Sequence, residues 1–136
     1  MTGYSQTPLA KKLGIKDGFI IKLVNQPNYY TNLFDDFPSV IIHSESENNH
    51  SVDFIHLFCT TFSELENNVT MLKNMLKKDG LFWISWPKGS SGISADLKRD
   101  DIREHLLSLG LVDVKICAID ENWSGLKFVY RVKDRY

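Results

Sequence analysis

The side chains best suited to binding a ligand stand near the ends of predicted strands in this chain of 136 residues. They carry amide, hydroxyl, carboxylate, indole and ammonium groups, and they are Asn25, Gln26, Thr60, Trp86, Lys88, Ser90, Glu121, Trp123 and Lys127. Indole rings offer an apolar shelf, and ammonium groups attract anions and aromatic faces. We therefore expect a site for a planar or anionic ligand. In the alternative interpretation, both tryptophans pack against the sheet edge and the lysines pair with Asp120 and Glu121.

A second candidate is the sequence Lys-Gly-Ser-Ser-Gly at residues 88–92, between a predicted strand and a predicted helix. Backbone N–H groups of such a loop can cradle a phosphate. The lysine precedes the glycines, however, and the glycine spacing is not that of a Walker motif. A flexible loop is therefore the alternative.

Catalytic constellations are absent from the sequence pattern. His56 alternates with Phe54 and Phe58 on one face of a predicted strand, which favours a core histidine over a catalytic one. No serine lies in a Gly-x-Ser-x-Gly elbow, and no cysteine or histidine has metal-ligand spacing. We therefore assign no catalytic residue, and we expect no metal and no cofactor.

The elements that would position these residues follow from the apolar pattern. Apolar runs bounded by turn residues predict strands at 19–24, 39–43, 52–59, 81–86, 112–119 and 126–132. Apolar stripes with start and stop signals predict helices at 8–13, from 61 to a close at Gly80, and at 98–109, with a short helix at 29–34. The clearest signal is Thr61 followed by Glu64, a capping box.

This order predicts an α/β fold with a mostly parallel sheet. Near-continuous apolar strands imply helices on both faces, which gives three layers. The short connection at residues 120–125 makes the last two strands an antiparallel hairpin. Length and composition fit one domain spanning residues 1–136.

Two stretches resemble class I S-adenosylmethionine-dependent methyltransferases. Residues 52–57 resemble the fourth strand of that family, and residues 76–85 resemble the approach to its fifth strand. The resemblance implies a truncated Rossmann-like fold that lacks the third strand and its flanking helices. It also implies a strand order of about 2-1-4-5-7-6 in methyltransferase terms.

Over its full length the chain resembles a family of small bacterial proteins catalogued as a domain of unknown function. Residues 4–15, 86–88 and 123–128 carry this resemblance. That family has no established activity, so the resemblance supports the fold and says little about chemistry.

The chain departs from the methyltransferase pattern after the first predicted strand. A glycine-rich turn is expected there, because backbone must approach the cofactor closely. Here residues 25–30 read Asn-Gln-Pro-Asn-Tyr-Tyr, and Pro27 removes one N–H donor. Glu45 lies at the spacing of a ribose-binding acid, but without the glycines that coincidence is weak.

Charge and cysteine usage bear on partners and location. Sixteen basic and seventeen acidic side chains give a net charge of −1, and no basic stripe is interleaved with aromatic residues, so we expect no nucleic-acid partner. No apolar run is long enough for a membrane helix, and no leader is apparent, so we expect a cytoplasmic protein without a membrane partner. Cys59 and Cys117 fit buried thiols in a reducing compartment; a disulfide or a redox role is the alternative.

Together these features predict a small methyltransferase-like domain without methyl transfer, acting as a ligand-binding or protein-interaction module. Its partner is an unknown small molecule or protein. The alternative is an enzyme that acts on an anionic or nucleotide-like small molecule at the carboxyl edge of the sheet, including a divergent methyltransferase. A homodimer formed through the exposed second strand is a further alternative.

Overall fold

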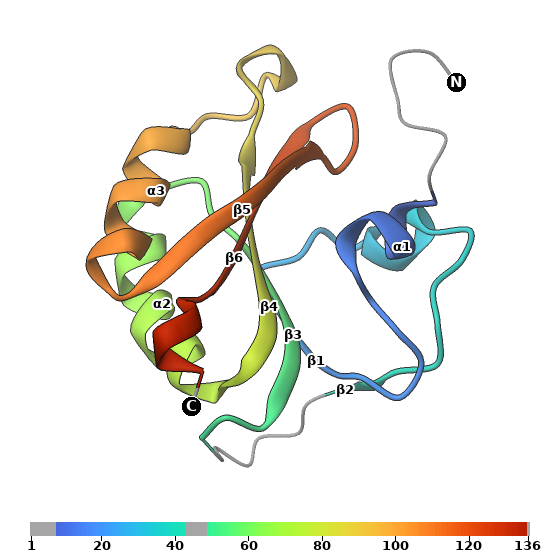
Figure 1. Ribbon diagram of the computed structural model, residues 1–136. Coiled ribbons are helices and arrows are strands. Elements are labelled where there is room, and N and C mark those ends of the chain that lie inside the picture. The colour runs from blue at the N-terminus through green and yellow to red at the C-terminus, as the bar shows by residue number, and fades with distance from the viewer. Residues whose placement is uncertain (1–7, 43–48, 136) are drawn as a thin grey trace.

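The computed structural model describes residues 8–42 and 49–135 (Figure 1). Its elements are α1 (Leu9–Leu13), β1 (Ile20–Val24), the 3₁₀ helix η1 (Tyr30–Leu33), β2 (Ile41–Ile42), β3 (Val52–Phe58), α2 (Phe62–Met75), β4 (Leu76–Pro87), η2 (Gly89–Ser91), α3 (Arg99–Ser108), β5 (Leu111–Ala118), β6 (Trp123–Tyr130) and η3 (Val132–Asp134). The end of the predicted second strand at His43 lies outside the described residues, as does Glu45.

The six strands form one sheet in the order β2-β1-β3-β4-β6-β5. β1 pairs in parallel with β2 and β3, and β3 pairs in parallel with β4. β6 is antiparallel to both of its neighbours, β4 and β5. The α/β class, the final hairpin and the strand order expected from the methyltransferase resemblance are confirmed.

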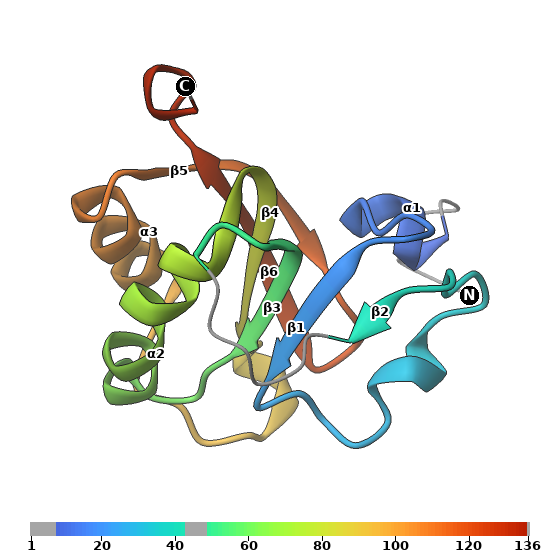
Figure 2. The ribbon, with the colours of Figure 1, turned by 90° about the horizontal axis from the view of Figure 1, so that it is seen from below.

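Helices cover both faces of the sheet (Figure 2). On one face, α2 and α3 bury an apolar stripe that consists of Leu65, Val69, Leu72, Ile102 and Leu106. On the other face, the much shorter α1 and η1 bury Ala10, Leu13 and Tyr30. The three-layer arrangement is therefore present, with one thick layer of helices and one thin one.

The end of α2 differs from the prediction. The helix stops at Met75, and residues 76–80 belong to β4 instead of closing the helix. Leu76 is fully buried and pairs with Val52, while Lys77 forms an ion pair of 2.9 Å with Asp53. A Cβ at Gly80 would lie 3.0 Å from the Asp53 carbonyl oxygen, so glycine permits this close approach of the strands. Tertiary pairing thus overrides the helical pattern of the sequence.

An acid distant in sequence holds the first helix. Thr7, which precedes this helix in the sequence, lies outside the described residues. The carboxylate of Asp36 accepts hydrogen bonds from the backbone N–H groups of Ala10 and Lys11, at 3.1 and 3.3 Å. Gly14 ends the helix in the left-handed conformation, with φ of 88°. Asp36 therefore ties the segment after η1 to α1.

The hairpin is longer than predicted, and β6 begins at Trp123 instead of Leu126. Gly125 is consequently a strand residue: a Cβ there would lie 2.8 Å from Ile119 Cδ1 and 3.1 Å from Trp83 Cε3. β5 forms the outer edge of the sheet and contains a register shift, because Asp113 and Lys115 pair with consecutive residues of β6 and Val114 pairs with none. A β-bulge therefore interrupts the edge strand.

Candidate functional site

The predicted site residues lie around the carboxyl edge of the sheet, with one exception. The strand order reverses between β1 and β3, and ligands of open α/β sheets bind at such a point. The β4–α3 connection and the β5–β6 turn lie at the same end of the molecule (Figure 1). Lys127 is the exception: it pairs with Trp83, four residues along β6 from Trp123, which is about 13 Å by strand rise.

The turn after β1 has an unusual backbone. Asn25 takes a left-handed φ of 58° in the place where a glycine would be expected, and asparagine tolerates that conformation better than most residues. The Tyr30 N–H donates to the Pro27 carbonyl at 3.0 Å, which leads the chain into η1. Asn25 and Gln26 are exposed at this turn.

The hydroxyl groups after β3 serve the start of α2. The backbone N–H and the hydroxyl of Thr60 both donate to Glu64 Oε1 at 2.8 Å. The Glu64 N–H donates to Thr61 Oγ1 at 3.1 Å, which completes the predicted capping box. The hydrogen bonds that the Glu64 carboxylate accepts from Thr60 and Thr61, the one from the Thr60 backbone above all, lower the pKa of Glu64. Thr60 therefore stabilises the start of α2 through its hydrogen bonds to Glu64.

Removing the cap hydroxyl tests this assignment. We expect Thr61→Ala to lower the free energy of unfolding by about 1 kcal/mol, because the Glu64 N–H loses its acceptor. Urea denaturation measures the change. The control Ser63→Ala alters an exposed position on the same helix turn and should stay within about 0.5 kcal/mol of the parent. Equal effects of the two substitutions would contradict the capping assignment.

The two tryptophans of the predicted shelf lie on opposite faces of the sheet. Trp86 packs in the apolar cluster under α2 and α3, whereas Trp123 packs in the cluster under α1 and η1. Pro87, not Trp86, is the β4 residue paired with Trp123. Adjacent strand residues point to opposite faces, so the two indoles do not form one continuous shelf.

Aromatic rings fill the crevice beside Trp123. We call Tyr30, His56, Phe58 and Trp123 the aromatic cluster. Its members are at most 8% exposed. The Phe58 ring meets Tyr30 edge-on at 5.7 Å and Trp123 edge-on at 5.0 Å between centroids, and it stacks on His56 at 4.3 Å. The cluster joins η1, β3 and β6 directly at the point where the strand order reverses.

His56 is a core histidine, as predicted. Its Nδ1 lies 2.9 Å from the Tyr30 hydroxyl and its Nε2 lies 2.7 Å from Ser85 Oγ, so both ring nitrogens have partners. Burial lowers the pKa of His56 to about 3 and raises the pKa of Tyr30. All three side chains are almost fully buried, so this chain of hydrogen bonds is part of the fold and is closed to solvent.

The β5–β6 turn closes over the same crevice. Asp120 Oδ1 accepts from the N–H groups of Asn122 and Trp123 at 2.8 Å, and its Oδ2 accepts from the Tyr29 hydroxyl at 3.2 Å. Burial, and then the Asp120 carboxylate, raise the pKa of Tyr29. The Asp120 carboxylate therefore joins the turn to the segment after β1, while Glu121 beside it is exposed.

The loop at residues 88–92, the second candidate site in the sequence, does not lead directly into an α-helix. Its residues fold as η2, and the Lys88 N–H donates to the Asn122 carbonyl of the β5–β6 turn at 2.8 Å. Ser90 is exposed. The next helix, α3, begins only at Arg99, so the N-terminus of this helix does not adjoin the loop in the way a phosphate cradle requires.

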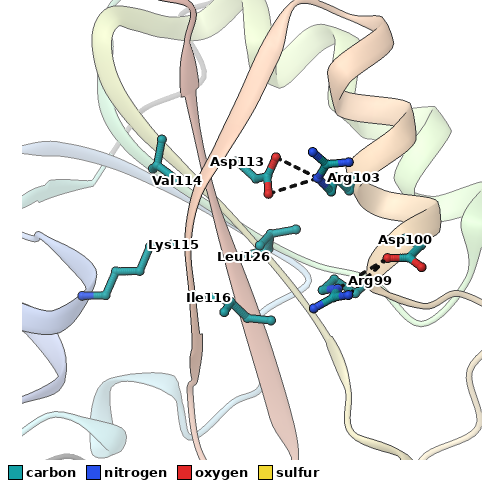
Figure 3. A pocket seen from close by; sticks show the side chains of 8 residues that line it. All are labelled: Arg99, Asp100, Arg103, Asp113, Val114, Lys115, Ile116 and Leu126. Carbon is teal, nitrogen blue, oxygen red and sulfur yellow. Dashed lines mark hydrogen bonds and ion pairs between the residues drawn. The ribbon is translucent and has the colours of Figure 1, made fainter.

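Two cavities lie away from the carboxyl edge of the sheet. One of about 490 Å³ is lined by α3 and the β5–β6 hairpin (Figure 3). Its arginines face acids: Arg103 Nε lies 3.1 Å from Asp113 Oδ1, and Arg99 Nε lies 3.4 Å from Asp100 Oδ1. The other, of about 410 Å³, adjoins Tyr130 and η3. None of the nine predicted site residues lines either cavity.

Within residues 8–42 and 49–135, no three His, Cys, Asp or Glu side chains are grouped to hold a metal ion. Across the same ranges, no helix combines the length and apolarity that crossing a membrane requires.

Both cysteines are free thiols, so the alternative of an internal disulfide is wrong. Burial, and then the Glu64 carboxylate, raise the pKa of Cys59 to about 12.

The sequence pattern did not single out Tyr30 or Phe58 as site residues. Phe58 shares a predicted strand face with His56, and Tyr30 is the last residue of the stretch 25–30 where a glycine-rich turn is expected. The sequence pattern does not reveal that η1 packs against the end of β3, because this contact depends on tertiary packing. The Lys127 side chain also lies elsewhere, above the Trp83 ring at 5.9 Å from its centroid.

Several solved structures similar to this chain are methyltransferases. A Sulfolobus solfataricus protein assigned to the type 11 methyltransferases superposes with a TM-score of 0.65 at 19% identity, over 94% of this chain and 92% of that chain. An Aquifex aeolicus SAM-dependent methyltransferase gives 0.61 at 15% identity, over 88% and 86%. The magnesium protoporphyrin IX methyltransferase of Synechocystis PCC 6803, with bound SAH, gives 0.56 at 12% identity, over 90% and 80%. No protein-family model matches the sequence, and no curated protein matches it. The chain therefore has a Rossmann-like, methyltransferase-like fold.

Proposed function

We propose that this chain is a methyltransferase-like binding module that does not transfer methyl groups. The observation that carries the proposal is the aromatic cluster. Tyr30, Phe58 and Trp123 are in ring contact across the point where the strand order reverses, which is the place where an open α/β sheet holds its ligand. The burial of these rings and their mutual contact support a site that does not take up an adenosyl group.

The turn after β1 supports the same conclusion. A cofactor-binding turn lets backbone N–H groups approach the ligand closely, which favours glycine. Here Asn25 and Gln26 add side chains and Pro27 has no N–H. The residues present therefore do not fit S-adenosylmethionine, the cofactor of the structurally similar methyltransferases.

The binding surface of the proposed module is the rim around the filled crevice. Four of the predicted site residues, Asn25, Gln26, Ser90 and Glu121, are exposed there. They come from three connections that lie on the same side of the molecule (Figure 2). Because these side chains are polar and the cluster beneath them is closed, a ligand or protein would bind on the rim and not within the sheet.

The test is the melting temperature of the purified protein with S-adenosylmethionine and with S-adenosylhomocysteine. A ligand at a hundred times its dissociation constant adds about 2.7 kcal/mol, which for a domain of this size is a shift of roughly 8–12 °C. We expect no shift with either compound at millimolar concentration. The Aquifex aeolicus methyltransferase, run in parallel, provides the positive control. A reproducible shift with either compound would overturn the proposal and favour a divergent methyltransferase.

A further inference from the structure

Three lysine side chains converge on the α1 face of the β5–β6 hairpin. We call Lys12, Lys115 and Lys127 the lysine cluster. Lys12 Nζ donates to the Ala118 carbonyl of β5 at 3.2 Å, and Lys115 Nζ donates to the Lys12 carbonyl at 3.1 Å. Figure 3 shows Lys115 reaching toward α1, away from the arginines of α3. Lys127 lies directly opposite Lys115 on the neighbouring strand.

These ammonium groups have no acidic partner in the described ranges. The ion pairs found there join Lys77 to Asp53, Arg99 to Asp100 and Arg103 to Asp113. None of them includes a member of the lysine cluster. Like charges placed directly opposite one another on adjacent strands destabilise a sheet, so Lys115 and Lys127 form an unfavourable pair that nothing within the described chain neutralises.

The surroundings of Lys127 add to the free-energy cost of placing Lys115 and Lys127 opposite one another. Its stem is half-buried and its Nζ stands 5.9 Å from the centroid of the Trp83 ring. Burial, and then the Lys115 ammonium, lower the pKa of Lys127. Cys117 is the pairing partner of Gly125 in the same ladder. Burial raises the pKa of its thiol, whereas Lys12, Lys115 and Lys127 all act to lower that pKa. The thiol therefore senses the positive potential of the whole cluster.

We propose that the lysine cluster binds a phosphate group. Each ammonium group has three donors, so Lys12 and Lys115 retain free donors beyond their bonds to carbonyl oxygens. In the bound state the flexible lysine stems would bring one donor of each ammonium group to a separate oxygen of a tetrahedral dianion, which a carboxylate with two oxygens and one charge does not match. The bound charge removes the repulsion between Lys115 and Lys127. This site is separate from the aromatic cluster and does not rest on the proposed function.

The first test measures the melting temperature in sodium phosphate and in sodium chloride of equal ionic strength. We expect phosphate, at ten times its dissociation constant, to raise the melting temperature of the parent protein by roughly 4–6 °C beyond the chloride value. Lys115→Gln and Lys127→Gln should abolish most of this difference. The control Lys16→Gln makes the same charge change at an exposed turn residue and should leave it intact. No excess shift in phosphate, or an equal shift in Lys127→Gln, overturns the proposal.

The second test locates the site through Cys117. Alkylation of the two cysteines by iodoacetamide at pH 8.5 is followed by peptide mass spectrometry, with phosphate or chloride present. Phosphate should slow the modification of Cys117 at least fivefold in the parent and less than twofold in Lys127→Gln, while the buried Cys59 provides the internal reference. If phosphate raises the melting temperature but leaves the rate at Cys117 unchanged, the anion binds elsewhere and the proposed site is wrong.

Glycerol phosphate and a nucleoside monophosphate, tested in the same way, identify the source of the phosphate group. Tighter binding of one of these esters than of inorganic phosphate assigns the site to a phosphorylated small molecule.

Discussion

Replacing Trp83 with alanine is expected to lower the free energy of unfolding by about 3–5 kcal/mol. Trp83 is fully buried in the central strand β4, and its indole N–H donates to the Leu13 carbonyl at the end of α1 at 2.8 Å. The substitution removes the largest fully buried side chain of the described residues, leaves a cavity under the thin helical layer and leaves the Leu13 carbonyl without its donor. Urea denaturation followed by far-ultraviolet circular dichroism measures the loss.

Two companion variants separate the contributions. Trp83→Phe keeps a large ring but loses the hydrogen bond to Leu13, and it should cost about 1–3 kcal/mol. Met71→Ala changes an exposed apolar residue of α2 that is 48% exposed, and it should cost less than about 0.5 kcal/mol. A cost below 1 kcal/mol for Trp83→Ala would show that α1 does not depend on this side chain.

Acidification from pH 7 to pH 5 is expected to remove about 2 kcal/mol of stability through His56 alone. The folded protein holds this imidazole neutral, because burial lowers its pKa to about 3, whereas the unfolded chain binds a proton near pH 6.5. The stabilisation is therefore complete above pH 6.5 and is lost progressively as the pH falls toward 3, where the total loss approaches about 5 kcal/mol. Urea denaturation at pH 7, 6 and 5 measures this dependence.

The variant His56→Gln isolates this contribution from that of the carboxylates. Glutamine does not titrate, so the difference in unfolding free energy between parent and variant should shrink by about 2 kcal/mol between pH 7 and pH 5. Met71→Ala, which removes no titratable group from an exposed position of α2, should keep the pH dependence of the parent. A difference between parent and His56→Gln that is the same at pH 7 and pH 5 would refute the assignment of the buried neutral imidazole.

Features written in local sequence were predictable. Thr61 and Glu64 predict the start of α2, because a capping box is formed by residues only three positions apart. The strand order was implied by the resemblance of residues 52–57 and 76–85 to the methyltransferases, while the short final connection predicted the antiparallel hairpin. His56 was recognisable as a core residue because its alternation with Phe54 and Phe58 places all three on one strand face.

Features set by pairing between distant strands were not predictable. The change from helix to strand at Leu76 depends on Val52, 24 residues earlier in the chain. The separation of Trp86 from Trp123 depends on a one-residue choice of register, since pairing Trp123 with Pro87 instead of Trp86 moves one indole to the other face. Local patterns place residues at an edge, but the register decides which of them share a surface.

The bulge at Val114 bears on how the molecule behaves at high concentration. β5 is eight residues long and borders the sheet, and a regular strand in that position offers its outer backbone groups to any other extended chain. The unpaired residue twists the strand and breaks the even spacing of those groups, so an incoming strand finds no continuous ladder to extend. Val114 and Ile116 can therefore stay about half-exposed there while the strand resists edge-to-edge polymerisation.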